Sequence, residues 1–278
     1  MNWLVQPFAY EFMQRGILAS VIVGILCAVM GTYVVLRGMA FLGDALAHAI
    51  LPGIAIAYLL NGSLLVGALI AAIFIALIIG LFSRQGTVKE DTAIGILFAA
   101  ALSLGIALIS SIKTYAVDLS HILFGNVLGV SITDLWLTAG LGLLILLTVV
   151  LLYKPFLVIS FDPVLAATMR LPAELLRNLM LVLLALTVVV SLQTVGVGLA
   201  AAMLVTPAAT AYLITRRLTS MMVISAVFGA LSSIIGLYLS YYLNIVSGSA
   251  IVLTATLFFV IAFLFNSRQG VLRRKINP

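Results

Sequence analysis

The sequence has 278 residues, of which 64% are hydrophobic and only 8% are charged. A soluble domain has about 25% charged residues, so a soluble fold of this length is excluded because it would lack the polar surface to cover its core. In a bilayer the apolar side chains face lipid and few charges are needed. The composition therefore predicts an integral membrane protein, with a single membrane domain over residues 1–278.

A helix that crosses a bilayer needs about 20 mostly apolar residues. Nine segments meet this requirement, and they lack the sustained alternation of polar and apolar residues that is typical of a membrane barrel. The sixth and seventh segments are separated only by Gln193 and Thr194, so we expect eight or nine spans. We predict an all-α polytopic protein with spans at residues 16–36, 39–60, 63–82, 93–112, 132–153, 178–195, 197–214, 220–242 and 245–266.

The basic residues predict the orientation of these helices. With nine alternating spans and a cytoplasmic C-terminus, all but two of the 14 lysines and arginines fall in inside loops, and only Arg15 and Lys113 fall outside. Inside loops of membrane proteins are enriched in basic residues, so we expect the N-terminus outside and the C-terminus in the cytoplasm. The net charge of +6 therefore reflects topology, and no nucleic-acid partner is expected.

The second span carries the only carboxylate placed well inside a predicted span, Asp44. An ionised aspartate near the centre of a spanning helix costs about 2.5–3.5 kcal/mol on insertion. His48 follows four residues later, so both side chains project from one face of the helix. If the span begins near Met39, His48 lies about 14 Å deep, near the midplane of a hydrocarbon core about 30 Å thick.

Pro52 follows His48 by another four residues. Because proline lacks an N–H, we expect the carbonyl of His48 to lose its normal helical partner. A carboxylate, an imidazole and a free carbonyl on one turn predict a metal site, and this ligand set suits Mn²⁺, Fe²⁺ or Zn²⁺ better than Mg²⁺ or Ca²⁺. The alternative is structural, with Asp44 and His48 satisfying each other or a neighbouring helix.

Two side chains from one copy cannot complete a four- or six-coordinate shell. We therefore expect a homodimer whose symmetry axis brings together two copies of Asp44 and of His48. The small residues Gly43 and Ala47 would then permit close approach of the two second spans.

Two other patterns in the sequence contain residue types found in binding sites. Asp118 and His121, three residues apart in the outside segment 113–131, form a possible metal-entry pair or are ordinary solvated residues. The Gly-Val-Gly run at 196–198 lies between apolar helices, so close helix packing is expected there rather than phosphate binding. The sequence has no Gly-x-x-x-x-Gly-Lys-Ser/Thr motif and no hydrolase signature, so we expect neither ATP binding by this chain nor an enzyme.

The inside segment 154–178 contains a short helix signal. Asp162 is a favourable N-cap, Pro163 suits the first helical position, and Pro172 ends the helix near Arg170. So short a helix has too little apolar surface to anchor itself in lipid. We therefore expect it to dock against a partner.

The stretch FLGDALAHAILPGIAIAYLL at 41–60 resembles the permeases of the manganese/zinc/iron-chelate family of ABC transporters. Four further segments resemble the same family in the same order. They are residues 89–110, 119–131, 160–172 and 192–215.

The resemblance implies a type II-like importer permease in a bacterial plasma (inner) membrane, working as a homodimer with two cytoplasmic ATPase subunits that bind ATP and an extracellular or periplasmic metal-binding protein. It implies that Asp44 and His48 lie on the metal path and that no cofactor is permanently bound. It also implies a coupling segment at 160–172, whose candidate contact residues are Asp162, Pro163, Ala166, Ala167, Arg170 and Leu171.

The predicted function is therefore the permease of an ATP-driven importer of a divalent transition metal. The pattern Asp-Ala-x-x-His-Ala-x-Leu-Pro-Gly from Asp44 looks more like the manganese or iron branch than the zinc branch, so Mn²⁺ is the expected cargo. An ion-coupled secondary metal transporter is the alternative, but Asp44 alone would have to carry both metal and proton. An embedded metalloenzyme would need a general base that the sequence does not offer.

Overall fold

The described part of the protein is entirely helical. The structure is a computed structural model, and within the part that it describes there is no β-strand. The described residues are 6–84, 90–111, 127–161 and 163–265.

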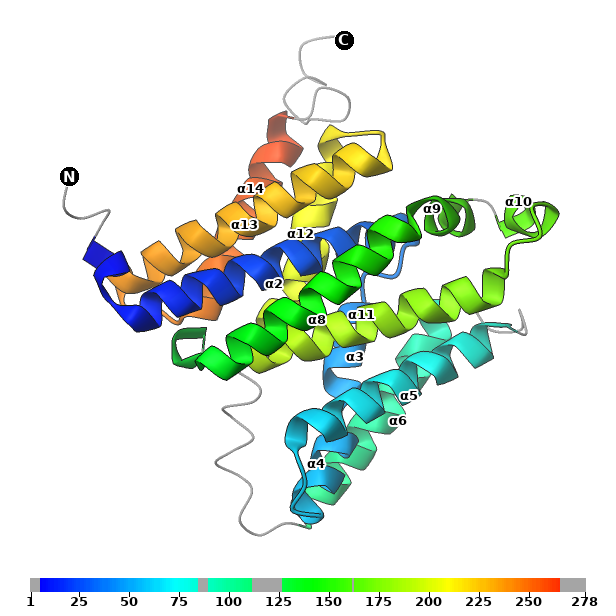
Figure 1. Ribbon diagram of the computed structural model, residues 1–278, viewed down its shortest axis with the longest axis horizontal. Coiled ribbons are helices and arrows are strands. Elements are labelled where there is room, and N and C mark those ends of the chain that lie inside the picture. Colours follow the sequence, from blue (N-terminus) through cyan, green and yellow to red (C-terminus); the bar gives the residue numbers. More distant parts are fainter. Residues whose placement is uncertain (1–5, 85–89, 112–126, 162, 266–278) are drawn as a thin grey trace.

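Within the described ranges, the helices follow one another with short connections (Figure 1). Two short 3-10 helices, η1 and η2, precede the first long helix and the helix α8. The elements are η1 (Gln6–Ala9), α2 (Glu11–Leu36), α3 (Leu42–Ala49), α4 (Leu51–Leu59), α5 (Leu64–Arg84), α6 (Glu90–Ser110), η2 (Val127–Gly129), α8 (Ile132–Leu151), α9 (Tyr153–Phe161), α10 (Pro163–Thr168), α11 (Ala173–Val195), α12 (Val197–Ile214), α13 (Leu218–Leu243) and α14 (Ser247–Phe265).

Among the described residues, eight stretches are long and apolar enough to cross a membrane, with α3 and α4 counted together as Leu42–Leu59. The remaining predicted span, 197–214, corresponds to the shorter apolar stretch Gly198–Ile214 in α12. The all-α polytopic prediction with eight or nine spans is confirmed, because runs of about 20 apolar residues leave few other ways to satisfy the backbone in lipid.

The boundary between α11 and α12 lies where the predicted spans 178–195 and 197–214 put it, but Gln193 and Thr194 do not form the separation. Gln193 and Thr194 lie inside α11, and the single residue between the helices is Gly196, with φ 84° and ψ 169°. Only glycine adopts this conformation readily. A Cβ on Gly198 would meet nothing within 4 Å. The expectation that these glycines serve close helix packing is therefore wrong, since Gly196 serves a change of chain direction.

The second predicted span is broken at Ile50. The helix α3 ends at Ala49 and α4 begins at Leu51, with Pro52 in its first turn. The carbonyl of His48 accepts a hydrogen bond from the Ile50 N–H. The expected free carbonyl is therefore absent, because the break supplies a local donor in place of the missing proline N–H.

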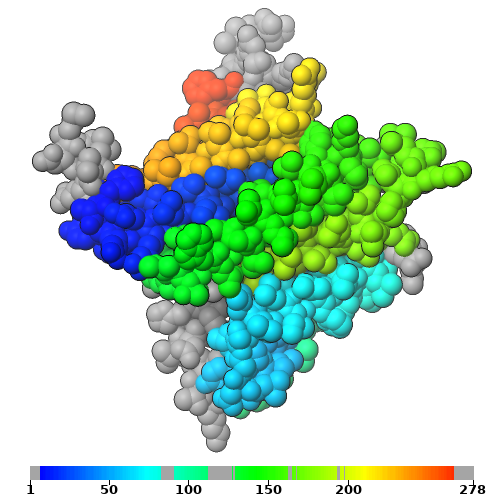
Figure 2. All heavy atoms as spheres, viewed as in Figure 1, coloured from blue at the N-terminus to red at the C-terminus, as the bar shows by residue number. Residues whose placement is uncertain are grey.

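The helix α2 is the centre of the fold and packs against α8, α11, α12 and α13. In Figure 1 it lies between α13 and α8, and Figure 2 shows α13, α2, α8, α11 and α5 following one another across one face. Lipid is as apolar as the side chains, so spanning helices associate by close packing and hydrogen bonding. The core of the protein is therefore a set of close helix crossings around α2.

Glycine and serine make the crossing of α2 with α13 possible. A Cβ on Gly229 would lie 2.4 Å from the carbonyl oxygen of Gly24. On either side of this point, the Ser225 hydroxyl donates to the Ala28 carbonyl at 3.1 Å, and the Ser233 hydroxyl donates to the Ser20 carbonyl at 2.9 Å. The two helices therefore touch backbone to backbone.

We expect Gly229→Leu to destabilise the protein by about 1–3 kcal/mol or to prevent folding, because overpacking here meets backbone that has no room to move. The measurement is the midpoint of thermal unfolding in detergent. Gly140→Leu is the matched control, since a Cβ on Gly140 in α8 would meet nothing within 4 Å. Equal midpoints for the two variants would contradict the packing argument.

Candidate functional site

Asp44 and His48 lie together on α3, which packs between α6 and α12. Every other residue of this eight-residue helix is buried. The Asp44 side chain is 42% exposed and the His48 side chain is 26% exposed. The helix therefore presents one open face in the first half of the second span, and that face carries a carboxylate and an imidazole.

The geometry of this pair determines which imidazole nitrogen is available. The Nδ1 atom of His48 lies 3.0 Å from the backbone carbonyl oxygen of Asp44 and 3.6 Å from its carboxylate oxygen Oδ1. A carbonyl oxygen accepts only, so in this contact Nδ1 carries the proton and donates it. Nε2 of the neutral ring then keeps its lone pair, which is the tautomer that binds a metal through Nε2.

An aromatic residue of α6 also contacts this face. The ring of Phe98 lies 5.8 Å from the His48 ring, with the two planes at 90°, and 5.4 Å from the Phe41 ring, with the planes at 88°. Phe98 was not among the residues predicted from the sequence. A phenylalanine in an apolar span has no pattern that distinguishes it from its neighbours.

The small residues of α3 do not lie on the open face. A Cβ on Gly43 would lie 3.0 Å from Cδ2 of Leu204 in α12, and Ala47 is fully buried. The expectation that Gly43 and Ala47 face a second copy is therefore wrong. They allow α3 to approach α12 of the same chain, and this approach leaves Asp44 and His48 on the open face.

One copy does not complete a metal shell within its described part. No group of three or more His, Cys, Asp or Glu side chains gathers among these residues. Asp118 and His121, the predicted entry pair, lie outside the described residues. Within the described part of one chain, Asp44 and His48 are therefore two neighbouring groups of the kinds that bind metals, too few to complete a shell.

The predicted coupling segment contains the short helix α10. It begins at Pro163, as predicted, and Asp162 lies outside the described residues. Arg170 follows its end in a left-handed conformation with φ 53°, and the Leu171 N–H donates to the Ala166 carbonyl at 3.1 Å. This pattern closes the C-terminus of the helix.

Two large apolar side chains are exposed at α10, beside the polar Thr168 and the charged Arg170. Leu165 is 46% exposed and Met169, just after the helix, is 56% exposed, whereas Ala166 is fully buried against its own chain. Ala166 therefore does not face a partner, contrary to expectation, and the side chain of Ala167 lies outside the described part. Leu165 and Met169, four residues apart, are the large apolar side chains exposed on this segment.

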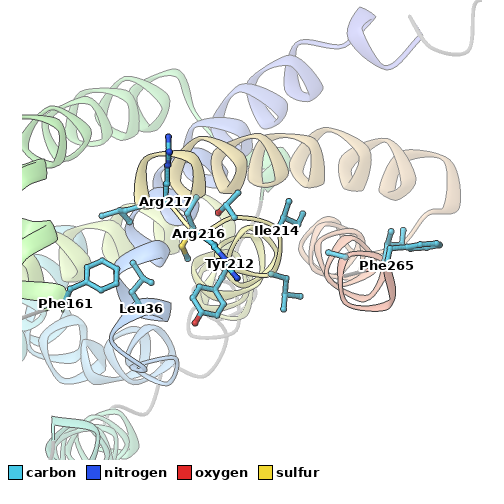
Figure 3. Close-up of a pocket in the computed structure, with 13 residues that line it drawn as sticks. Leu36, Phe161, Tyr212, Ile214, Arg216, Arg217 and Phe265 are labelled. Carbon is cyan, nitrogen blue, oxygen red and sulfur yellow. The ribbon is translucent and has the colours of Figure 1, made fainter. Parts of the chain in front are cut away.

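A hollow of about 1060 Å³ lies where several helices end near this segment (Figure 3). Leu36 of α2 and Phe161 of α9 lie on one side of the end of α12, and Phe265 of α14 lies on the other. Arg216 and Arg217, in the connection from α12 to α13, also line it. All of these helix ends belong to the side predicted to be cytoplasmic, so the hollow and α10 share that side.

Comparison with known proteins assigns the family. Residues 9–266 match the ABC 3 transport family. The chain is 49% identical over 269 residues to the manganese transport system membrane protein MntC of Halalkalibacterium halodurans, which covers 97% of this chain and 92% of the relative. It is 41% identical over 273 residues to the chelated iron transport system membrane protein YfeD of Yersinia pestis, covering 98% of this chain and 92% of the relative.

A solved structure of PsaBC from Streptococcus pneumoniae in complex with Fab has the same fold. The TM-score is 0.86 with 41% sequence identity, and the superposition covers 99% of each chain. These matches confirm the resemblance that the sequence motifs indicated. The protein therefore belongs to the ABC 3 transport family, as a multi-pass bacterial membrane permease rather than an enzyme.

Proposed function

We propose that this permease forms the membrane path of an ATP-driven importer of Mn²⁺ and that Asp44 and His48 are the ligands on this path. One observation carries the proposal. Among the eight residues of α3, only these two are not buried, so the helix exposes two metal-binding groups and nothing else. The MntC relative, 49% identical, has manganese transport in its name, and this supports Mn²⁺ as the cargo.

The two groups suit a transported ion. The Asp44 carboxylate supplies negative charge that offsets part of the cost of removing a divalent cation from water, and Nε2 of His48 supplies a neutral nitrogen ligand. Mn²⁺ and Fe²⁺ accept this mixture of oxygen and imidazole ligands. A transported ion must be bound tightly enough to enter the path and weakly enough to leave it. A site with only two ligands from each chain meets this requirement.

The alternative of a secondary transporter is less well supported. Such a mechanism needs intramembrane carboxylates for the coupling ion. Among the described residues, the other carboxylates lie in the first turn of a long helix or next to its start, at the ends of α2, α6, α8 and α11. Membership of an ABC transporter family implies instead that separate ATPase subunits supply the energy and that a metal-binding protein delivers the cargo.

We expect Asp44→Asn and His48→Ala each to lower Mn²⁺ uptake by more than about tenfold, because each removes one of two ligands. The measurement is uptake of radioactive manganese at limiting concentration in cells that express the whole transporter. Asp134→Asn is the matched control. Its carboxylate caps α8 through Ser131, at a helix end away from α3, and its uptake should stay near wild type. Normal uptake by both site variants would refute the ligand assignment.

We further propose that α10 couples the permease to its ATPase through Leu165 and Met169. Both apolar side chains are exposed on the side predicted to be cytoplasmic, where lipid does not cover them. The hollow lined by Leu36, Phe161 and Arg216 lies on the same side and adds concave surface for the partner.

The double variant Leu165→Glu, Met169→Glu should lose copurification with the ATPase subunit or lose cargo-stimulated ATP hydrolysis, because two charges replace the apolar contact. The exchange Leu165→Met with Met169→Leu keeps that surface apolar and should leave both properties within about twofold of wild type, since such volume-conserving changes cost little. Wild-type binding and hydrolysis by the double glutamate variant would remove the coupling role from this surface.

The open face of α3 also supports a homodimer. A partly exposed carboxylate facing lipid costs several kcal/mol, and a second copy facing it would enclose a polar path with four ligands. We propose that the symmetry axis runs beside Asp44.

In a background of Cys27→Ala, Ala40→Cys should cross-link between two chains, because Ala40 is exposed just before α3 on its open side. Cys27, the only native cysteine, is fully buried. The control is Leu143→Cys on α8, whose side chain is 69% exposed and which lies away from α3. Efficient cross-linking through position 143 together with none through position 40 would place the dimer interface elsewhere.

A further inference from the structure

Phe98, the aromatic residue of α6, makes ring contacts with two side chains. One is His48 on the open face of α3, and the other is Phe41, which directly precedes α3. Its ring lies perpendicular to the imidazole of His48 at 5.8 Å and perpendicular to the ring of Phe41 at 5.4 Å. We propose that Phe98 is a positioning residue that holds the His48 imidazole in the orientation in which Nε2 is free to bind the cargo. This inference rests on the proposed ligand role of His48.

Two contacts together fix the imidazole. The hydrogen bond from Nδ1 to the Asp44 carbonyl, 3.0 Å long, fixes where one nitrogen lies. It leaves the ring free to tilt about that bond. The perpendicular contact with Phe98 fixes the plane of the ring, since edge-to-face pairs at centroid distances of about 4.5–7 Å are favourable and directional. The ring then has one free polar atom, Nε2.

Phe98 is itself anchored and does not simply follow His48. Its side chain is half-buried and packs against the hydrophobic core. Phe41, in contrast, is 44% exposed, and its ring contacts the same Phe98 ring. The packing of Phe98 against the hydrophobic core therefore supports the imidazole of His48 on the neighbouring helix α3. Ligands need this kind of support, because a site that is loose by a fraction of an ångström binds its ion poorly.

The alternative is that Phe98 only fills space between α3 and α6. The two roles differ in what they change. Loss of packing lowers the amount of folded protein and its unfolding temperature, whereas loss of positioning weakens metal binding in protein that remains folded.

The test uses the purified complex of permease and ATPase, with three permease variants: Phe98→Leu, Phe98→Tyr and Phe258→Leu. Mn²⁺ binding is titrated by electron paramagnetic resonance, and pulsed spectra of bound Mn²⁺ report nitrogen from an imidazole ligand. Phe98→Leu should raise the Kd for Mn²⁺ about three- to tenfold and weaken the nitrogen signal. Phe98→Tyr keeps the ring and should restore both to near wild type.

Phe258→Leu is the matched control. Its ring pairs with Phe228 at 5.4 Å on α13 and α14, so it loses an aromatic contact of similar size away from α3. It should keep the wild-type Kd even if its unfolding temperature falls. A Phe98→Leu protein with wild-type Kd and nitrogen signal would overturn the positioning role, and so would failure of Phe98→Tyr to restore them.

The two proposals fail separately. If Asp44→Asn and His48→Ala both transport normally, the ligand assignment itself is wrong. If those two variants lose transport while Phe98→Leu binds Mn²⁺ as the wild type does, only the role of Phe98 is wrong.

Discussion

The close approach of α2 to its neighbours is the constraint on which the rest of the structure depends. A Cβ on Gly31 would lie 1.6 Å from the carbonyl oxygen of Leu204, so α12 lies directly against the α2 backbone. The other side of Leu204 receives Gly43, where a Cβ would lie 3.0 Å from its Cδ2 atom. One leucine thus separates two glycines on two helices. Through this contact, the packing of α2 against α12 determines where α3 lies and which of its residues stay uncovered.

The break after α3 is held by the same kind of contact. A Cβ on Gly105 of α6 would lie 2.8 Å from Cβ of Leu51 and 3.2 Å from the nitrogen of Pro52. On the far side of the break, Gly53 of α4 and Gly67 of α5 face each other so closely that a Cβ on either would lie 2.4 Å from the other's carbonyl oxygen. The two halves of the second span are therefore fixed separately. This lets α3 keep a polar face without disturbing the apolar α4.

Sequence patterns predicted the spans and the pair of polar residues for clear physical reasons. Apolar runs must be about as long as the bilayer is thick, and residues four apart must share one helical face. Both rules concern a single helix, and Asp44 and His48 do lie on one face of α3. The same rules say nothing about what covers that face. The sequence could not show that Gly43 packs on α12 or that Phe98 reaches His48, because these contacts join residues far apart in the chain.

The cytoplasmic segment shows the same limit. Proline at position 163 predicted where α10 begins, because its fixed φ suits the first helical position. The resemblance named Ala166 among the candidate contact residues, but its side chain is buried against its own chain. The family comparison supplied what neither periodicity nor size can give, which is that the chain is one subunit of a larger transporter.

The single residue between α11 and α12 has a mechanical consequence. Because Gly196 alone joins the two helices, no loop is present there to absorb a change of angle. The helix α12 has 18 residues and is therefore about 27 Å long. A rotation of about 5° at Gly196 would displace its far end by about 2 Å over that lever arm. That end carries Tyr212 and Ile214, which line the hollow on the side predicted to be cytoplasmic, so a small turn at one side of the membrane is amplified at the other.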